Sequence, residues 1–135
     1  MKLMKSGELA RRCEVNKQTI RFYERKGLLS ASDSTAHNYK LYNREDIRRV
    51  RFIKKAQGLG FSLEEIKDLL SLRSSKEAPC FDVRNRAQLK FDDISEKIRQ
   101  LEAMRRTLAK LIGQCHSTLS SECPILESLE FEERN

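Results

Sequence analysis

The sequence contains no apolar run of about 18 residues, which argues against a membrane-spanning helix. The N-terminal segment MKLMKSGELARR has no apolar stretch of signal-peptide length. There is no conventional nucleophile–base pair, no glycine-rich phosphate loop, no internal repeat and no low-complexity tract. These absences argue against a membrane protein, a secreted protein and an enzyme. We therefore expect the chain in the cytoplasm, where thiols are kept reduced.

Apolar residues are also scarce, and charged residues are abundant. Of the 135 residues 39% are hydrophobic and 35% charged, a balance that favours a small globular head with an elongated, solvated helix over one large core. The net charge of +7 is unevenly placed, because residues 1–79 carry 18 Lys and Arg against 10 Asp and Glu, whereas residues 80–135 are nearly neutral. This asymmetry predicts a head that faces phosphate and a tail that faces protein.

The chain has only four cysteines, and three of them are informatively placed. Cys115 and Cys123 bracket a short polar loop after a long helical pattern, and Cys80 precedes that pattern. If residues 82–112 form one helix, its ends lie roughly 45 Å apart at about 1.5 Å per residue, too far for Cys80 to reach Cys115 of its own chain. An antiparallel second chain brings the three thiolates together, and thiolates select soft metal ions.

The first half of the chain reads as a helix-turn-helix. Ser6 is the predicted N-cap of a short helix ending near residues 12–13, and Asn16 is the predicted N-cap of a second helix. Gly27 suits the C′ position after this second helix. Glu14 lies in the intervening turn, where glycine adopts the required backbone conformation with less strain.

A small wing and two further helices follow. Residues 39–42 alternate in the manner of a short hairpin, and Asn43 is placed to cap a third helix. Ser62 and Glu65 form a predicted capping box for a fourth helix.

From residue 91 to residue 112 the apolar spacing becomes a heptad, interrupted only by Arg105. We predict a mainly α protein with a winged helix-turn-helix head in residues 1–75, an antiparallel coiled-coil dimerisation helix in residues 80–113, and a metal-binding loop with a tail in residues 114–135. The apolar heptad positions are Phe91, Ile94, Ile98, Leu101, Leu108 and Ile112.

The segments NKQTIRFYERKGLL, NYKLYNREDIRRVRFIKKAQGLGFSLEEIKDLL and CHSTLSSECPILESL resemble the metal-responsive branch of the MerR family over residues 3–130. The resemblance implies a homodimer that binds double-stranded promoter DNA with an over-long spacer. It also implies that metal makes the dimer distort this DNA, so that RNA polymerase engages both promoter elements.

The resemblance assigns DNA contacts to the recognition helix, to the wing and to the third helix. Lys40 stands where arginine is more usual, which argues against a bidentate phosphate contact there. The positions that match the family's DNA-contacting residues are Lys17, Arg21, Tyr23, Tyr39, Lys40 and Lys54.

Cys80, Cys115 and Cys123 match the ligands of the branch that senses divalent metals. Three thiolates suit Hg(II), Pb(II) or Cd(II), whereas Zn(II) usually takes a fourth ligand, for which His116 or a loop oxygen is available. The seven residues between Cys115 and Cys123 instead match the loop length of copper(I)-type members. Two other hypotheses are a thiol redox switch, in which Cys115 and Cys123 oxidise to a disulfide, and a structural zinc module.

Overall fold

The computed structural model describes residues 3–34, 37, 39–75, 77, 80–114 and 123–130. The chain divides into two compact units, Met1–Lys90 and Phe91–Asn135, and the longest helix belongs to both. The predicted Cys115 and His116 lie outside the described residues. In chain order the elements are β1 (Met4–Lys5), α1 (Ser6–Cys13), α2 (Lys17–Arg25), β2 (Asp33–Ser34), β3 (Lys40–Tyr42), α3 (Arg44–Gly58), α4 (Leu63–Ser74), α5 (Cys80–Gln114) and α6 (Pro124–Glu130).

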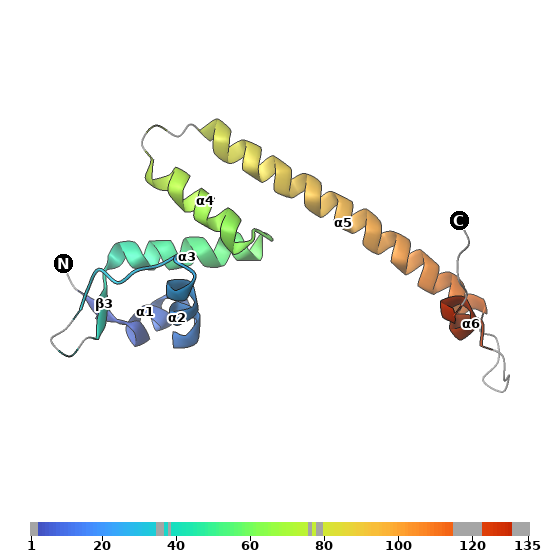
Figure 1. The fold of residues 1–135 in the computed structure, drawn as a ribbon, viewed down its shortest axis with the longest axis horizontal. Coiled ribbons are helices and arrows are strands. Elements are labelled where there is room, and N and C mark those ends of the chain that lie inside the picture. The colour runs from blue at the N-terminus through green and yellow to red at the C-terminus, as the bar shows by residue number, and fades with distance from the viewer. Residues whose placement is uncertain are drawn as a thin grey trace. The chain divides into compact units, whose positions relative to one another are not determined.

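Helices α1 and α2 form the predicted helix-turn-helix beside α3 (Figure 1). Asn16 caps α2, because its side chain accepts the Thr19 N–H at 2.8 Å. The predicted capping role of Ser6 is wrong: Ser6 is the first residue of α1, and the N-cap is Lys5, which makes no side-chain capping bond. Glu14 adopts the left-handed conformation expected of a glycine, with φ 57° and ψ 43°, at a cost of about 1 kcal/mol.

The wing is a three-stranded antiparallel sheet in the order β1-β3-β2. Strands β2 and β3 confirm the predicted hairpin, with Asp33 opposite Leu41. Strand β1 was not predicted, and it pairs Met4 with Tyr42. This pairing ties the start of the chain, and therefore the start of α1, to the wing.

One apolar core holds the head together. Its most deeply buried side chains come from α1, α2, the loop after α2, β3, α3 and α4, so every principal element of the head contributes to it. Burial of this apolar surface is the main stabilising contribution to the head. The largest fully buried residues are Leu9, Ile20, Leu28, Tyr42, Val50, Ile53 and Ile66.

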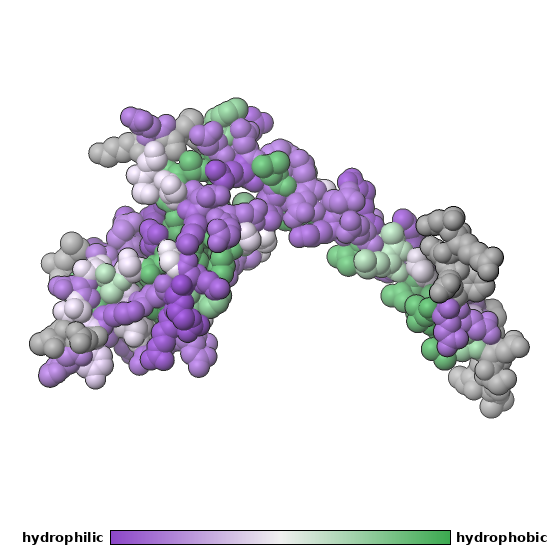
Figure 2. All heavy atoms as spheres, viewed as in Figure 1, coloured by the Kyte–Doolittle hydropathy of each residue, from purple (hydrophilic) through white to green (hydrophobic). Residues whose placement is uncertain are grey.

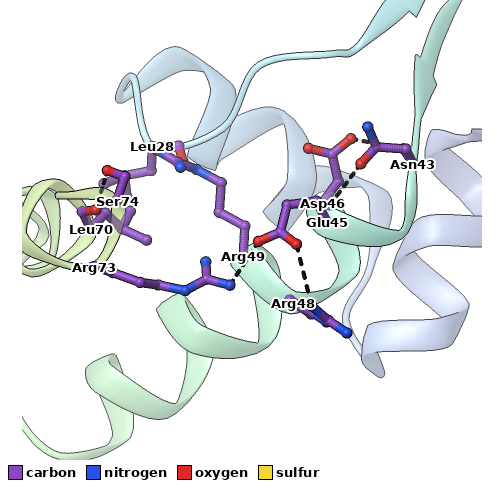
Figure 3. A network of polar contacts seen from close by, with 9 residues as sticks. All are labelled: Leu28, Asn43, Glu45, Asp46, Arg48, Arg49, Leu70, Arg73 and Ser74. Carbon is purple, nitrogen blue, oxygen red and sulfur yellow. Dashed lines mark hydrogen bonds and ion pairs between the residues drawn. The ribbon is translucent and has the colours of Figure 1, made fainter. Parts of the chain in front are cut away.

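Polar contacts fix α3 at its N-terminal end (Figure 3). The predicted cap at Asn43 is confirmed as a capping box, in which the buried Asp46 accepts the Asn43 N–H at 2.8 Å. Arg49 donates to the carbonyl of Leu28 at 2.5 Å, which holds the loop after α2. Arg73 of α4 pairs with Glu45 of α3 at 2.7 Å.

Ion pairs join the start of α5 to α4 within the first unit. Lys90 pairs with Glu65 at 2.9 Å and Arg86 with Asp68 at 3.1 Å. The Lys90 ammonium also lies 5.7 Å from the centre of the Phe61 ring. These contacts join the first three turns of α5 to the head, and the first unit accordingly includes α5 as far as Lys90.

In the second unit, α5 exposes the apolar residues of the predicted heptad. Figure 2 shows hydrophobic side chains gathered along the C-terminal half of α5. Phe91 is 65% exposed, Leu101 63% and Ile112 64%, whereas Leu111 is buried. In the part of the chain that the structure describes, no helix is both long enough and apolar enough to cross a membrane.

We expect Glu65→Ala to destabilise the chain more than Glu64→Ala, its neighbour in the first turn of α4. Glu65 accepts the Ser62 N–H at 2.7 Å and pairs with Lys90. These two contacts, the first being the larger, lower the pKa of Glu65 to about 2. The expected difference in the free energy of unfolding at neutral pH is at most about 1 kcal/mol, because the carboxylate is partly exposed.

The pH dependence has a definite sign. Because the folded-state pKa of Glu65 lies below its ordinary value of 4.5, its contribution is present above pH 4.5 and is lost as the pH falls towards 2. Denaturant titrations of both variants between neutral pH and pH 2 measure how the difference in their free energies of unfolding depends on pH. Equal destabilisation by the two substitutions, or a difference that stays constant with pH, contradicts the assignment.

Candidate nucleic-acid interface and metal ligands

The start of α1, the start of α2 and the wing surround an open hollow of about 720 Å³. Glu8 is the only acidic residue among its described lining residues, and it is already paired with Arg12 at 3.0 Å. The hollow therefore carries a strong positive charge, which suits a polyanion. Its cationic lining residues are Lys5, Arg11, Lys17, Arg21 and Lys40.

Lys17 and Arg21 lie one turn apart on α2, and both are exposed. The Asn16 cap fixes the start of this helix, through bonds from the N–H and the hydroxyl of Thr19 at 2.8 and 3.0 Å. Among the described residues, neither Lys17 nor Arg21 makes an ion pair. Both cations are therefore available to an external anion.

Tyr23 is not on this surface, which corrects the assignment made from the sequence. Its side chain is only 2% exposed and belongs to the core of the head. The hydroxyl donates to the side-chain oxygen of Gln57 in α3 at 2.7 Å, and burial raises the pKa of Tyr23. Tyr23 therefore anchors α2 to α3, and we remove it from the residues expected to contact DNA.

The wing residues Tyr39 and Lys40 are exposed beside the hollow. The Lys5 ammonium lies 4.8 Å from the centre of the Tyr39 ring. The Lys40 ammonium pairs with the carboxylate of Glu24, which also accepts a hydrogen bond from the Tyr42 hydroxyl. Glu24 thus joins the wing to α2, a role that sequence reasoning missed because its partners lie 16 and 18 residues away.

Lys54 lies on α3 at the other end of α1. Its ammonium donates to the carbonyls of Glu14 and Cys13 at 3.2 and 3.4 Å, and Arg51 donates to the carbonyl of Arg12 at 3.2 Å. Both cations stabilise the negative end of the α1 dipole. Cys13 is buried, as expected of a small hydrophobic residue, and burial raises the pKa of its thiol.

Two of the three predicted metal ligands lie among the described residues, and both are free thiols. Cys80 is exposed at the first position of α5. Cys123 is half-buried immediately before α6, and its carbonyl accepts the Glu127 N–H at 3.0 Å. No group of three or more His, Cys, Asp or Glu side chains that suits a metal ion occurs within the ranges that the structure describes.

Comparison with known proteins gives consistent matches. Residues 4–72 match the family model for MerR HTH family regulatory proteins, and residues 47–111 match the model described as MerR, DNA binding. A mercuric resistance operon regulatory protein of Bacillus cereus is 43% identical over 124 residues, which cover 91% of this chain and 94% of that protein. The HTH-type transcriptional regulator HmrR of Rhizobium leguminosarum bv. viciae is 40% identical over 126 residues, covering 93% and 97%.

A solved structure is also similar along nearly the whole chain. It is the transcription regulator PbrR691 from Ralstonia metallidurans CH34 in complex with lead(II), which has a TM-score of 0.84 and 34% identity, and the match covers 93% of this chain and 98% of that one. The predicted mainly α fold and the resemblance inferred from the sequence are both confirmed. The chain therefore belongs to the MerR family, as a metal-responsive, DNA-binding transcription regulator and not an enzyme.

Proposed function

We propose that the chain binds promoter DNA as a homodimer in the cytoplasm and activates transcription by distorting that DNA when a soft divalent metal binds. RNA polymerase is the proposed partner on the same promoter. The effector is Hg(II), Pb(II), Cd(II) or Zn(II), since one relative regulates a mercuric resistance operon and one similar structure holds lead(II). The observation that carries the proposal is the exposed apolar seam of α5, flanked on both sides by cysteines.

The seam argues for a dimer. Its six apolar residues follow steps of three and four along α5, except where Arg105 occupies the position between Leu101 and Leu108, and each is between 39% and 65% exposed. An apolar seam of this kind is stable in water only when another apolar surface covers it. The α5 helix of a second chain supplies the matching heptad surface. In the antiparallel arrangement, the Cys80 end of one chain meets the 115–123 segment of the other.

The donor chemistry suits a soft metal ion. Cys80 is an exposed free thiol and Cys123 a half-buried free thiol, and both would bind such an ion as thiolates. We propose that Cys80 of one chain and Cys115 and Cys123 of the other hold the metal, with His116 as a possible fourth ligand for Zn(II). A continuous α5 from Cys80 to Gln114 supports this cross-chain assignment over a site within one chain.

Three alternatives lead to different experimental results. A copper(I)-type sensor responds to Cu(I) and keeps its response when Cys80 is replaced. A thiol redox switch responds to peroxide without metal, and a thiol assay detects the loss of Cys115 and Cys123. A structural zinc module unfolds when its metal is removed, whereas a sensor stays folded without metal.

We expect complementation between two defective chains. A Cys80→Ser chain and a chain carrying Cys115→Ser and Cys123→Ser each form homodimers with two incomplete sites. Mixed by unfolding and refolding together, they form heterodimers with one complete site and one site without thiols. Equilibrium dialysis against Pb(II) should therefore show more tightly bound metal in the mixture than in either homodimer.

The control is the same mixture with Cys13→Ser added to both chains, because Cys13 is buried in the head and takes no part in the proposed site. This substitution should leave the gain in bound Pb(II) unchanged. If the mixture binds no more Pb(II) than the separate homodimers, the metal site does not combine ligands from two chains.

We expect Arg21→Ala to weaken binding to DNA and to reduce its dependence on salt. Arg21 is exposed beside the cationic hollow and has no ion-pair partner among the described residues. If Arg21 contacts one phosphate, the slope of the logarithm of affinity against the logarithm of salt falls by about 0.9. Fluorescence anisotropy measures this on a duplex that the unsubstituted chain selects from a random pool.

Arg99→Ala is the matched control, since Arg99 is an exposed arginine on α5 whose ion-pair partner among the described residues is Glu96. It should leave the salt slope unchanged. Lys54→Ala should also weaken binding to DNA. The thermal stability of this variant must be measured in parallel, because Lys54 also stabilises the end of α1. An unchanged slope for Arg21→Ala removes Arg21 from the phosphate contacts.

We expect metal to change the geometry of the bound DNA more than the occupancy. A ligand shifts an equilibrium only by its differential affinity for the two states, so the metal must favour the distorting conformation of the dimer. Pb(II) should therefore change a fluorescent reporter at the centre of the selected duplex while DNA affinity changes by less than about tenfold, or roughly 1.4 kcal/mol. Release of the DNA on adding Pb(II) identifies a derepressor with this fold and overturns the proposed mechanism.

A further inference from the structure

Gly7, in the first turn of α1, lies directly beneath the side chain of Lys17 on α2. A Cβ atom built on Gly7 lies 2.8 Å from Cε of Lys17 and 3.5 Å from Nζ. Carbon atoms do not approach so closely, since the optimal separation is about 3.5–4.0 Å. Only glycine at this position lets the end of the lysine side chain lie flat against α1.

The missing Cβ of Gly7 leaves room for the end of the Lys17 side chain beside α1. The Asn16 cap fixes the backbone of Lys17 at the start of α2. No hydrogen bond or ion pair to the Lys17 ammonium occurs among the described residues. A four-carbon lysine stem can take many rotamers, and the rotamer that lies beside α1 is open only while residue 7 has no Cβ.

The position of this ammonium suits an incoming phosphate. It lies in the hollow that Arg21, Tyr39 and Lys40 also line. It is also near the N-terminal end of α1, where the helix dipole is positive and Lys5 provides no side-chain cap. A cation in this field lacks a counter-charge, and a phosphate supplies one.

We propose that Gly7 is a positioning residue for DNA binding, which acts by holding Lys17 against α1 with its ammonium towards the hollow. The inference rests on the proposed binding of DNA by this face of the head. An alanine methyl group displaces the end of the Lys17 side chain but leaves the backbone of α1 in place, because the atoms that it meets are the flexible end of that side chain.

Gly7→Ala in the full chain should therefore separate stability from DNA binding. The affinity for the selected duplex should fall about threefold or more, and the salt slope should fall by up to about 0.9, towards that of Lys17→Ala. The melting temperature should stay the same or rise, because alanine favours the helix and loses less conformational freedom on folding.

Gly58→Ala is the matched control. Gly58 is the last residue of α3, and a Cβ atom there meets nothing within 4 Å. The same glycine-to-alanine change should leave both the affinity and the salt slope unchanged. A loss of affinity as large as that of Gly7→Ala indicates a general effect of helix stabilisation and overturns the inference.

The double variant Gly7→Ala/Lys17→Ala tests whether Gly7 acts through Lys17. The double variant should bind no more weakly than Lys17→Ala alone, because the group that Gly7 positions is already missing. Full additivity of the two losses of affinity overturns the inference, and so does an unaltered affinity of Gly7→Ala. In either case, weaker DNA binding by Lys17→Ala leaves the DNA-binding proposal intact. If the unsubstituted chain selects no duplex with salt-dependent affinity, the proposed function itself fails.

Discussion

The head depends on the burial of one face of α2 against α1 and α3. Ile20 and Tyr23 lie on this face, and the Tyr23 hydroxyl is satisfied by Gln57. Because the helix is fixed by its buried side, the cationic residues on its other side have a defined direction. The same packing that stabilises the head therefore orients the surface that faces DNA, and the wing is joined to this surface through Glu24.

The second unit has the opposite character, because its longest apolar surface is left uncovered within one chain. A chain with 39% hydrophobic residues has enough of them for one small core and one interhelical seam. In the proposed dimer the seam and the metal site are coupled, since the association that covers the apolar stripe also brings Cys80 to the other chain. Metal binding and dimer geometry then depend on the same contacts.

Most local signals in the sequence predicted the structure, with Ser6 as the exception, whereas contacts between distant residues were not predictable. Asn16, Asn43 and the pair of Ser62 and Glu65 act within three or four residues of themselves, so the caps of α2, α3 and α4 were predictable. Ser6 fits the same pattern, but α1 begins at Ser6 itself, one residue earlier than a cap at Ser6 implies. Met4 and Lys5, which precede it, pair with β3. A two-residue strand carries no periodicity, which is why β1 was missed.

The candidate site shows the same division. The cationic character of the head follows from composition, and the exposure of Lys17 and Arg21 agrees with the surface expected from the motif. Tyr23 was misplaced because an aromatic residue with a hydroxyl suits both a core position and a DNA contact, and only the fold reveals Gln57 beside it. The partner of Lys40 lies on another element, so no local pattern indicates it.

The contact between Glu24 and Lys40 also has a consequence for the rate at which the head meets DNA. A carboxylate beside a wing cation weakens the long-range attraction to a polyanion, and electrostatic attraction governs the rate of encounter more than the lifetime of the complex. Collisions with arbitrary stretches of duplex are thereby made less productive. A phosphate that binds Lys40 must first displace the Glu24 carboxylate, so the net gain from that contact is smaller than for a cation without a partner.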